Sequence, residues 1–258
     1  MPIALLNRSV FQLSGEGLMP WLEGIITNSL KSDITFAALL TPQGKIIADF
    51  FVSKDKETLL IDTPQKFSGD LMKRLKLYKL RAPIEIIDMS ETLSVYASWD
   101  NDEQRGHVDP RHPSLGRRLI SADQQTAEGD YNAHRLSLGV ADSEWDFDTV
   151  KTFPADANMD LMNGVDFQKG CFVGQEVVSR MKRMTTVKKR MRGVIFNGAA
   201  TAGDRIMAGE RVIGDILSVH GQLGMALIRL DRLSDAATQP TVNDVAIKIM
   251  DSVDGQSH

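Results

Sequence analysis

The hydrophobic positions of the first fifty residues alternate between strand-like runs and helical spacing. A strand is predicted to end over Val10 to Leu13, with Ser14 as the cap of a following helix. The apolar face of that helix would hold Leu18, Trp21, Leu22, Ile25 and Ile26. Phe36 to Leu40 and Lys45 to Val52 read as two further strands. Proline second and glycine fourth in Thr41 to Gly44 suit a type I turn, so these strands are predicted to form a hairpin.

The next segment predicts a strand over Thr58 to Asp62 and then a helix. The helix follows from apolar residues that recur on one face, namely Phe67, Leu71, Leu75 and Tyr78. Strands over Ile84 to Asp88 and Thr92 to Ser98 come next, and a second helix is expected near Asp130 to Leu138. This order resembles a split β-α-β unit, in which helices would cover one face of an antiparallel sheet.

The composition changes twice along the chain. Residues 100–130 are rich in charge, proline and glycine, which predicts a long surface connection rather than packed structure. Beyond Met191, short apolar runs separated by Gly, Asn and Asp predict a small β-barrel or sandwich. Its expected strands are Arg192 to Phe196, Arg205 to Met207, Arg211 to Val219, Met225 to Leu230 and Val245 to Met250. We therefore predict an α+β protein with one region at residues 1–191 and a second domain at 192–258.

Composition and charge narrow the class of protein. The 258 residues are 42% hydrophobic, which is enough to bury a sizeable core. A formal net charge of -4 provides no general attraction to nucleic acids or anionic membranes, so we expect neither as a direct partner. The single cysteine points to a reducing compartment. The start of the chain lacks signal-peptide character and no apolar run approaches the ~20 residues of a membrane span, so we expect a cytoplasmic protein.

Several common sites are absent from the sequence. Gly15 to Pro20 ends in proline where a dinucleotide fingerprint needs glycine, and no phosphate-binding G-x-x-x-x-G-K-[ST] motif occurs. His107 and His112 lie five apart in a proline-containing segment, and one cysteine cannot form a multi-cysteine zinc site. No metal site is therefore predicted.

The one cysteine, Cys171, lies in the segment Lys169 to Glu176, between Gly170 and Gly174. A lone cysteine is most often a small buried hydrophobe. Here the two glycines permit unusual backbone angles, and Lys169 would favour a thiolate if its amine folds towards the sulfur. The same would hold for three cations downstream, Arg180, Lys182 and Arg183. The flanking residues thus favour an accessible thiol over a buried one.

Two other places combine polar groups with apolar surroundings. Asp49 lies among Ile and Phe in the hairpin strand, which indicates that it faces either a cavity or solvent. Asp156 and Asn158 precede the cysteine segment and are candidates for helix caps. A carboxylate with an amide can also bind the amino and carbonyl edge of a flat heterocycle. The interval from Arg180 to Arg192 carries seven Lys or Arg and no acid.

Taken in order, these segments resemble the YgfZ-like folate-binding proteins of iron-sulfur cluster assembly, relatives of the glycine-cleavage T-protein, an aminomethyltransferase. The most specific part is the K-G-C-[FY]-x-G-Q-E signature at Lys169 to Glu176. The resemblance extends to about Arg192 and also uses Asn28, Gln43 to Asp49, Asp109 to Arg111, Gly116 to Arg118, Tyr131, Arg135, Gly139 and Pro154 to Asn158.

This resemblance implies an aminomethyltransferase-like folate-binding fold, with a ferredoxin-like unit and a C-terminal β-barrel around a channel for tetrahydrofolate. It also implies a role in maturing or repairing [4Fe-4S] proteins, including radical enzymes that modify tRNA, with iron-sulfur client or assembly proteins as partners. The implied thiol site is Cys171 with Lys169, Gly170, Gly174, Gln175 and Glu176. The implied folate contacts are Asn28, Asp49, Arg135, Asp156 and Asn158. The basic interval would hold the glutamate tail of folate or form a solvated surface.

The chain departs from this family at three places. Asp156 replaces the usual glutamate, Asp142 to Glu144 replace Pro-Glu-Gly, and Ser179 to Met184 lack a glycine. Two alternatives to an accessory factor stay open. One is a tetrahydrofolate-dependent aminomethyl or methyl transferase in which Asp49 orients the reactive nitrogen. The other is a cysteine hydrolase in which His134 or His107 activates the thiol.

Overall fold

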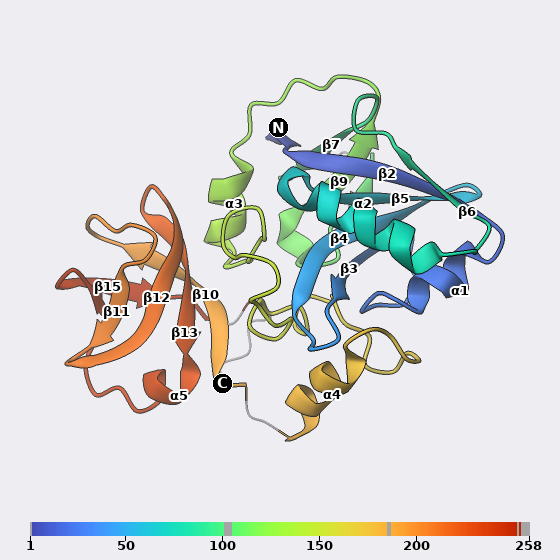
Figure 1. Cartoon of the computed structure of the whole chain (residues 1–258). Coiled ribbons are helices and arrows are strands. Elements are labelled where there is room, and N and C mark those ends of the chain that lie inside the picture. Colours follow the sequence, from blue (N-terminus) through green and yellow to red (C-terminus); the bar gives the residue numbers. More distant parts are fainter. Residues whose placement is uncertain (1, 101–104, 185–186, 252, 254–258) are drawn as a thin grey trace.

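The computed structural model describes residues 2–100, 105–184, 187–251 and 253. In these ranges the chain forms two antiparallel sheets and a closed barrel, and the barrel lies to one side of the sheets in Figure 1. The first sheet has the order β3-β4-β5-β2-β6. Its strands are β2 (Arg8–Gly15), β3 (Ile34–Leu40), β4 (Ile46–Asp55), β5 (Thr58–Pro64) and β6 (Ile84–Asp88).

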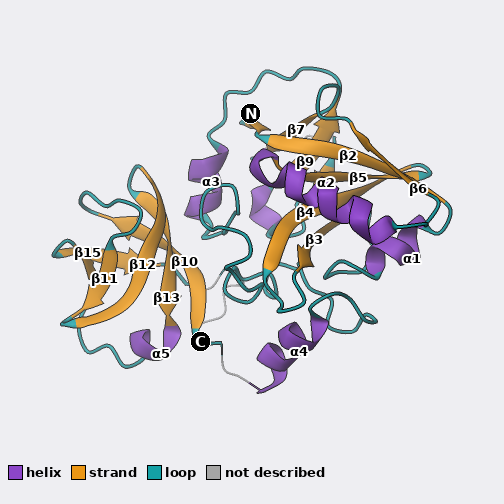
Figure 2. Ribbon diagram, in the orientation of Figure 1, coloured by secondary structure: helices purple, strands orange, loops and turns teal. Residues whose placement is uncertain are grey.

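Helices α1 (Leu18–Glu23) and α2 (Gln65–Lys79) cover one face of this sheet, as Figure 2 shows. Leu71 and Leu75 of α2 are fully buried against it, which confirms the predicted amphipathic helix. The other face packs on a second sheet and on the loops that lead to the barrel. Strand β4 is therefore buried on both faces from Ile46 to Ser53.

The hairpin of β3 and β4 is confirmed. Its turn is closed by the Gly44 amide, which donates to the Thr41 carbonyl at 2.8 Å. The predicted cap at Ser14 is wrong, because β2 continues through Ser14 to Gly15 and α1 begins only after Gly17. Gly15 has a φ of 127°, and a β-carbon there would lie 2.0 Å from the Pro83 carbonyl oxygen. The crossing of two backbones thus fixes where the strand ends.

The second sheet has the order β1-β7-β9-β8. Its strands are β1 (Ile3–Leu6), β7 (Ser94–Ser98), β8 (His107–Val108) and β9 (Arg117–Ser121). The predicted unit placed the strands now called β6 and β7 in one sheet, whereas the structure divides them between two. The reason is that β1, which the sequence pattern did not reveal, pairs with β7 from Ile3 opposite Ser98 to Leu6 opposite Val95.

The prediction of a surface connection over residues 100–130 is wrong for residues 107–121, whereas residues 122–130 do form an irregular and mostly exposed connection. The segment contains β8, β9 and a short 3-10 helix, η1 (Pro113–Leu115), while residues 101–104 lie outside the described residues. Asp109, Arg111 and Arg118 from this segment are buried, with at most 3% of each residue exposed. Charged residues can be buried in this way when they neutralise one another.

The barrel has the order β10-β13-β12-β11-β14-β15 and is closed. Its strands are β10 (Lys189–Phe196), β11 (Arg205–Ala208), β12 (Arg211–His220), β13 (Leu223–Arg229), β14 (Thr241–Val242) and β15 (Val245–Ile249). The five predicted strands are confirmed, while β14 and the short helix α5 (Leu230–Leu233) were not expected. Val194, Phe196 and Ile228 are among the buried residues that fill its interior.

Two helices and a long segment join the sheets to the barrel. Helix α3 (Tyr131–Ser137) was expected on the sheet, but it packs against β13 of the barrel. Residues 138–174 then run between the two parts with little regular structure and lead to α4 (Gln175–Met184) (Figure 1). One hydrophobic cluster holds Phe51 of the sheet, Met159 of this segment and Met225 of the barrel. In the described residues, no helix is both long and apolar enough to cross a membrane.

Candidate functional site

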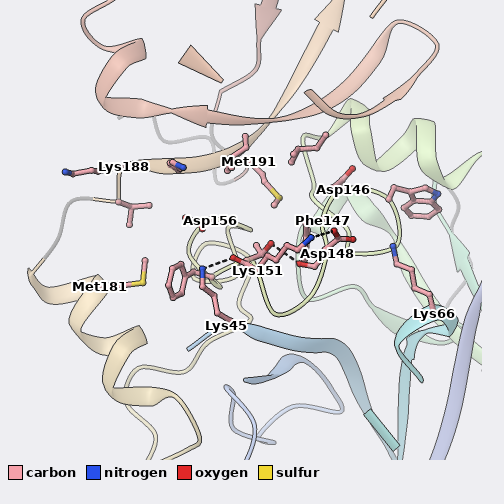
Figure 3. A pocket seen from close by; sticks show the side chains of 17 residues that line it. Lys45, Lys66, Asp146, Phe147, Asp148, Lys151, Asp156, Met181, Lys188 and Met191 are labelled. Carbon is pink, nitrogen blue, oxygen red and sulfur yellow. Dashed lines mark hydrogen bonds and ion pairs between the residues drawn. The ribbon is translucent and has the colours of Figure 1, made fainter. Parts of the chain in front are cut away.

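A cavity of about 730 Å³ lies where the barrel, the 145–156 segment, the β3–β4 hairpin and α4 meet (Figure 3). This volume is within the usual range for small-molecule sites. Its apolar lining residues are Trp145, Phe147, Phe153, Met181, Val187, Met191, Leu217 and Leu227. Its charged lining residues are Lys45, Lys66, Lys151, Lys188, Lys189, Asp146, Asp148 and Asp156. Aromatic walls with a few charged groups suit a flat ligand that carries polar and anionic substituents.

Asp156 and Lys45 form the polar centre of this cavity. Burial raises the pKa of Asp156, while Lys45 and Lys189 oppose that rise. The Lys45 ammonium lies 3.3 Å from the centre of the Phe153 ring and donates to the Lys151 carbonyl at 2.7 Å. Burial lowers the pKa of Lys45, and Asp156 acts in the opposite direction. The carboxylate and the ammonium are thus near each other without a direct ion pair, and both face the space a ligand would fill.

Asn158 holds the segment of Asp156 against the barrel. Its φ is 58°, a left-handed conformation that asparagine tolerates better than most residues. Its side-chain amide donates to the Met191 carbonyl at 2.7 Å, and the Met191 amide donates to the Asp156 carbonyl at 2.8 Å. The structure therefore uses the expected ligand-binding amide to join the segment to β10, and leaves the Asp156 carboxylate towards the cavity.

Arg135 is fully buried and anchors another wall of the cavity. Its guanidinium binds both carboxylate oxygens of Asp146, at 2.5 and 3.1 Å, and donates to the Val140 carbonyl at 3.0 Å. Asp146 also accepts a hydrogen bond from Ser218 of β12. Since Asp146 lines the cavity, its ion pair with Arg135 fixes the cavity wall to α3, and its hydrogen bond from Ser218 fixes the wall to the barrel.

Asp49 and Asn28 lie away from this cavity lining. Asp49 is buried, with 4% of the residue exposed, and accepts a short hydrogen bond from the Ser143 hydroxyl. Burial and the nearby Asp142 raise the pKa of Asp49, against the influence of Ser143. The Asn28 amide donates to the carbonyls of Phe36 and Asn163 at 2.9 and 2.6 Å. Both residues therefore bond within the fold, and neither lines the cavity.

The residues of the Cys171 segment, from Lys169 to Glu176, are not among those that line the cavity. Cys171 is exposed and its thiol is free, which fits the expectation of an accessible sulfur. The Lys169 ammonium, expected to act on the thiol, instead donates to the carbonyls of Glu23, Ile26 and Asn28 at 2.5, 2.8 and 2.9 Å. Burial lowers the pKa of Lys169 to about 8. Lys169 therefore fixes the start of the cysteine segment to the chain that follows α1.

The remaining signature residues shape the end of this segment. Gly174 has a φ of 82°, and a β-carbon there would lie 2.7 Å from the Thr41 carbonyl oxygen. Gly170 has open space around it, so a side chain at that position would meet nothing within 4 Å. Gln175 and Glu176 form the first turn of α4, where the acidic side chain suits the positive end of the helix.

The structure gives no support to the hydrolase alternative. His134 stacks on Trp99 with 4.5 Å between the ring centres, and its ring nitrogen bonds the Ser114 carbonyl at 2.9 Å. Neither His134 nor His107 forms a hydrogen bond with Cys171, and all three residues lie within the described ranges. Among the residues that the structure describes, no group of three or more His, Cys, Asp or Glu side chains is gathered as for a metal ion.

The basic interval at Arg180 to Arg192 is divided by the fold. Lys188 and Lys189 line the cavity, whereas Arg190 pairs with Asp160 at 2.8 Å. Sequence reasoning missed Lys66, Lys151 and the aromatic wall of Trp145, Phe147 and Phe153. The sequence did offer an indication of Lys45 as a site residue, because Lys45 lies inside the hairpin segment that carried the family resemblance.

The fold is that of an aminomethyltransferase. The glycine cleavage system aminomethyltransferase T from Bartonella henselae matches with a TM-score of 0.71 over 98% of this chain and 85% of that one, at 11% identity. Residues 188–251 match the family described as the CAF17 C-terminal beta-barrel domain. The chain is a CAF17/YgfZ-like protein of the aminomethyltransferase fold, which confirms both the resemblance and the predicted fold class.

Two fungal relatives illustrate the similarity. The mitochondrial iron-sulfur cluster assembly factor IBA57 homolog of Mycosarcoma maydis is 30% identical over 76% of this chain. The IBA57 homolog of Pyricularia oryzae is 29% identical over 90% of this chain and 72% of its own length. The chain spans little more than half of the first two relatives it matches, 57% and 54% of their lengths.

The expectation of a cytoplasmic protein is wrong by this comparison, because these relatives are named as mitochondrial. That expectation rested on the single cysteine, which indicates a reducing environment, and on a start of the chain without signal-peptide character and a sequence without a membrane-length apolar run. A reducing environment is not peculiar to the cytoplasm, so the cysteine count carried less information about location than was assumed.

Proposed function

We propose that this protein is a tetrahydrofolate-binding accessory factor in the assembly or repair of iron-sulfur proteins. The observation that carries the proposal is the cavity in which Asp156 lies among lysines and aromatic walls. A pterin ring offers an amino group and ring N–H donors to a carboxylate, and the glutamate tail of folate offers carboxylates to lysines. The charged and aromatic groups present therefore match both ends of that ligand.

Each expected folate residue has a distinct part in this proposal. Asp156 accepts hydrogen bonds from the pterin edge, and Lys188 and Lys189 bind the glutamate tail. Asp49, Arg135 and Asn158 position the segments that carry the walls, and none of the three lines the cavity. Asn28 holds β3 and the loop at Asn163, farther from the walls. Tetrahydrofolate, when bound, would be able to accept and carry a one-carbon unit on its nitrogens. A transferase would need Asp49 beside that nitrogen, and its burial under Ser143 favours the accessory role.

The iron-sulfur part of the proposal rests on the relatives and on the thiol. The relatives are named as iron-sulfur cluster assembly factors, and Cys171 is exposed on a segment held at both ends. We place Cys171 at the contact with an iron-sulfur client or assembly protein, with tRNA-modifying radical enzymes among the clients. The open space at Gly170 lets such a partner approach the sulfur closely.

Asp156→Ala is expected to weaken tetrahydrofolate binding by about 10- to 100-fold, since hydrogen bonds to a charged group contribute about 1.5–3 kcal/mol. Anaerobic isothermal titration calorimetry measures the dissociation constant. Asp148→Ala removes an exposed aspartate from the same cavity and is the matched control, expected to bind nearly as wild type. Asp49→Ala tests a buried residue that does not line the cavity, and it should weaken binding less than Asp156→Ala. Equal affinity in wild type and Asp156→Ala would remove Asp156 from the ligand site.

Cys171→Ala is expected to leave the fold and tetrahydrofolate affinity intact, because the side chain is exposed and lines no described cavity. In cells that lack the native protein, it should fail to restore the activity of a [4Fe-4S] enzyme such as aconitase under oxidative stress. Cys171→Ser controls for the size of the side chain, and wild type expressed at a matched level controls for protein abundance. Full rescue by Cys171→Ala would show that the thiol is dispensable.

A further inference from the structure

The turn that joins β3 to β4 contacts both the cavity and the thiol segment. On one side, Lys45 lines the cavity and its ammonium bonds the Lys151 carbonyl. The next residue, Ile46, exchanges backbone hydrogen bonds with the same wall, donating to Thr152 at 3.0 Å and accepting from Val150. A ligand that presses on Phe153 or Lys45 therefore acts directly on this turn.

On its other side, the turn packs against the end of the cysteine segment. A β-carbon on Gly44 would lie 3.0 Å from the β-carbon of Val177 in α4, and one on Gly174 would lie 3.2 Å from the Gly44 α-carbon. Two glycines thus bring two backbones into contact where any side chain would hold them apart. Helix α4 reaches the cavity as well, since Met181 lines it one turn beyond Val177.

Cys171 lies between two anchors, and only the second is formed by elements that also line the cavity. Lys169 fixes the start of the segment through three carbonyl groups, and Phe172 is buried beside the thiol. The end of the segment, at Gly174, is held by the turn and by α4. Both of those elements carry cavity-lining residues, so a cavity ligand bears on one anchor of the thiol segment and not on the other.

We propose that the Thr41–Lys45 turn is a positioning element that couples the cavity to the thiol, so that a ligand in the cavity restricts access to Cys171. The inference rests on the proposed function, because it takes tetrahydrofolate as the cavity ligand. A bound ligand that contacts Lys45 and Met181 limits the movement of the turn and of α4, and through Gly44 and Val177 it limits the movement of Gly174. The thiol is then presented in fewer conformations when folate is bound.

The test is the rate at which iodoacetamide alkylates the full-length protein, followed by intact mass, with and without saturating tetrahydrofolate. The chain holds one cysteine, so a single adduct reports Cys171 alone. Saturation is expected to slow alkylation by about fivefold or more, the lower range of usual coupling between sites. Calorimetry on the same samples measures binding separately.

Val177→Ala removes the side chain that meets Gly44, at a half-buried helical position outside the cavity lining. It is expected to keep tetrahydrofolate affinity within about twofold and to reduce the slowing to below about twofold. Val108→Ala, at a half-exposed position in β8, is the matched control and should keep the full effect. Hydrogen exchange of the Gly174 to Val178 amides gives a second readout, with slower exchange expected in the complex.

The possible outcomes distinguish a failure of the proposed coupling from a failure of the proposed function. Absence of tetrahydrofolate binding contradicts the proposed function, whatever the alkylation rates. Binding with no change in alkylation of wild type overturns the coupling and leaves the proposed function standing. Undiminished protection in Val177→Ala also overturns it, because the ligand would then shield the sulfur directly instead of acting through the turn.

Discussion

Arg135→Met is expected to lower the free energy of unfolding by about 3–5 kcal/mol at neutral pH. The substitution keeps an unbranched side chain but removes the guanidinium, so the buried Asp146 carboxylate loses its bidentate partner. A loss of this size is a large fraction of the total stability of an ordinary domain. Urea unfolding followed by circular dichroism measures it.

The matched control for this prediction is Lys151→Met, which breaks an ion pair with Asp148 in which both side chains are exposed. Such surface pairs contribute at most about 1 kcal/mol, so little change is expected. Because Asp146 lines the cavity, Arg135→Met should also weaken tetrahydrofolate binding. A loss of stability no larger than that of Lys151→Met would contradict the role assigned to the buried pair.

Asp142→Asn is expected to cost about 3 kcal/mol at pH 7, with a deficit that shrinks as the pH falls below about 4. Burial acts to raise the pKa of Asp142, but Arg111, Arg8 and Arg135 hold it well below its usual range. Arg111 donates directly to the carboxylate at 3.0 Å. A carboxylate with a lowered folded-state pKa adds stability above its unfolded pKa of about 3.9, and that stability is lost as the pH falls towards the folded pKa.

The measurement is the urea unfolding free energy of wild type and Asp142→Asn between pH 7 and pH 3. Asp109, also paired with Arg111, has a lowered pKa and titrates in the same direction, so wild type itself should lose stability in acid. Asp49 has a raised pKa and opposes this trend. Asp148→Asn, at an exposed position, is the control. A deficit of equal size at both ends of the range would show that the charge of Asp142 is unimportant.

The elements that sequence predicted correctly are those whose patterns are local. The β3–β4 hairpin, helix α2 and five barrel strands each follow from spacing within about ten residues. The division into two sheets could not be predicted in this way, because it depends on β1 pairing with β7 about ninety residues later. Nothing in the four residues of β1 specifies that partner.

The buried charges show why polarity misled the analysis of residues 100–130. Arg118 of β9 binds Asp62 of β5 at 2.7 Å, and Arg111 binds Asp142 from a segment beyond α3. Each residue resembles a surface charge when its neighbours in sequence are considered alone. Apart from Asp109, which pairs with Arg111 two positions away, these neutralising partners come from other parts of the chain, so the cost of burial is offset only when the fold is complete.

Sequence reasoning could predict only the part of the candidate site whose residues are close together in the chain. Asp156 and the cysteine segment were found because a compact motif surrounds them. Asp49 was noticed as a charge in an apolar strand, but its partner Ser143 is 94 positions away. The five lysines of the cavity come from four separate parts of the chain that meet only in three dimensions. Lys45, Lys188 and Lys189 lie in segments that the sequence singled out, whereas Lys66 and Lys151 are single lysines with no local signal.

The charge around the cavity has a consequence for the kinetics of binding. The whole chain has a net charge of -4, yet the cavity is lined by five lysines and three aspartates. An anionic molecule is therefore repelled by much of the surface and attracted at this opening, which guides diffusion towards it. Salt screens such guidance within about 10 Å at 0.1 M, so the speed of capture depends on ionic strength more than the lifetime of the complex does.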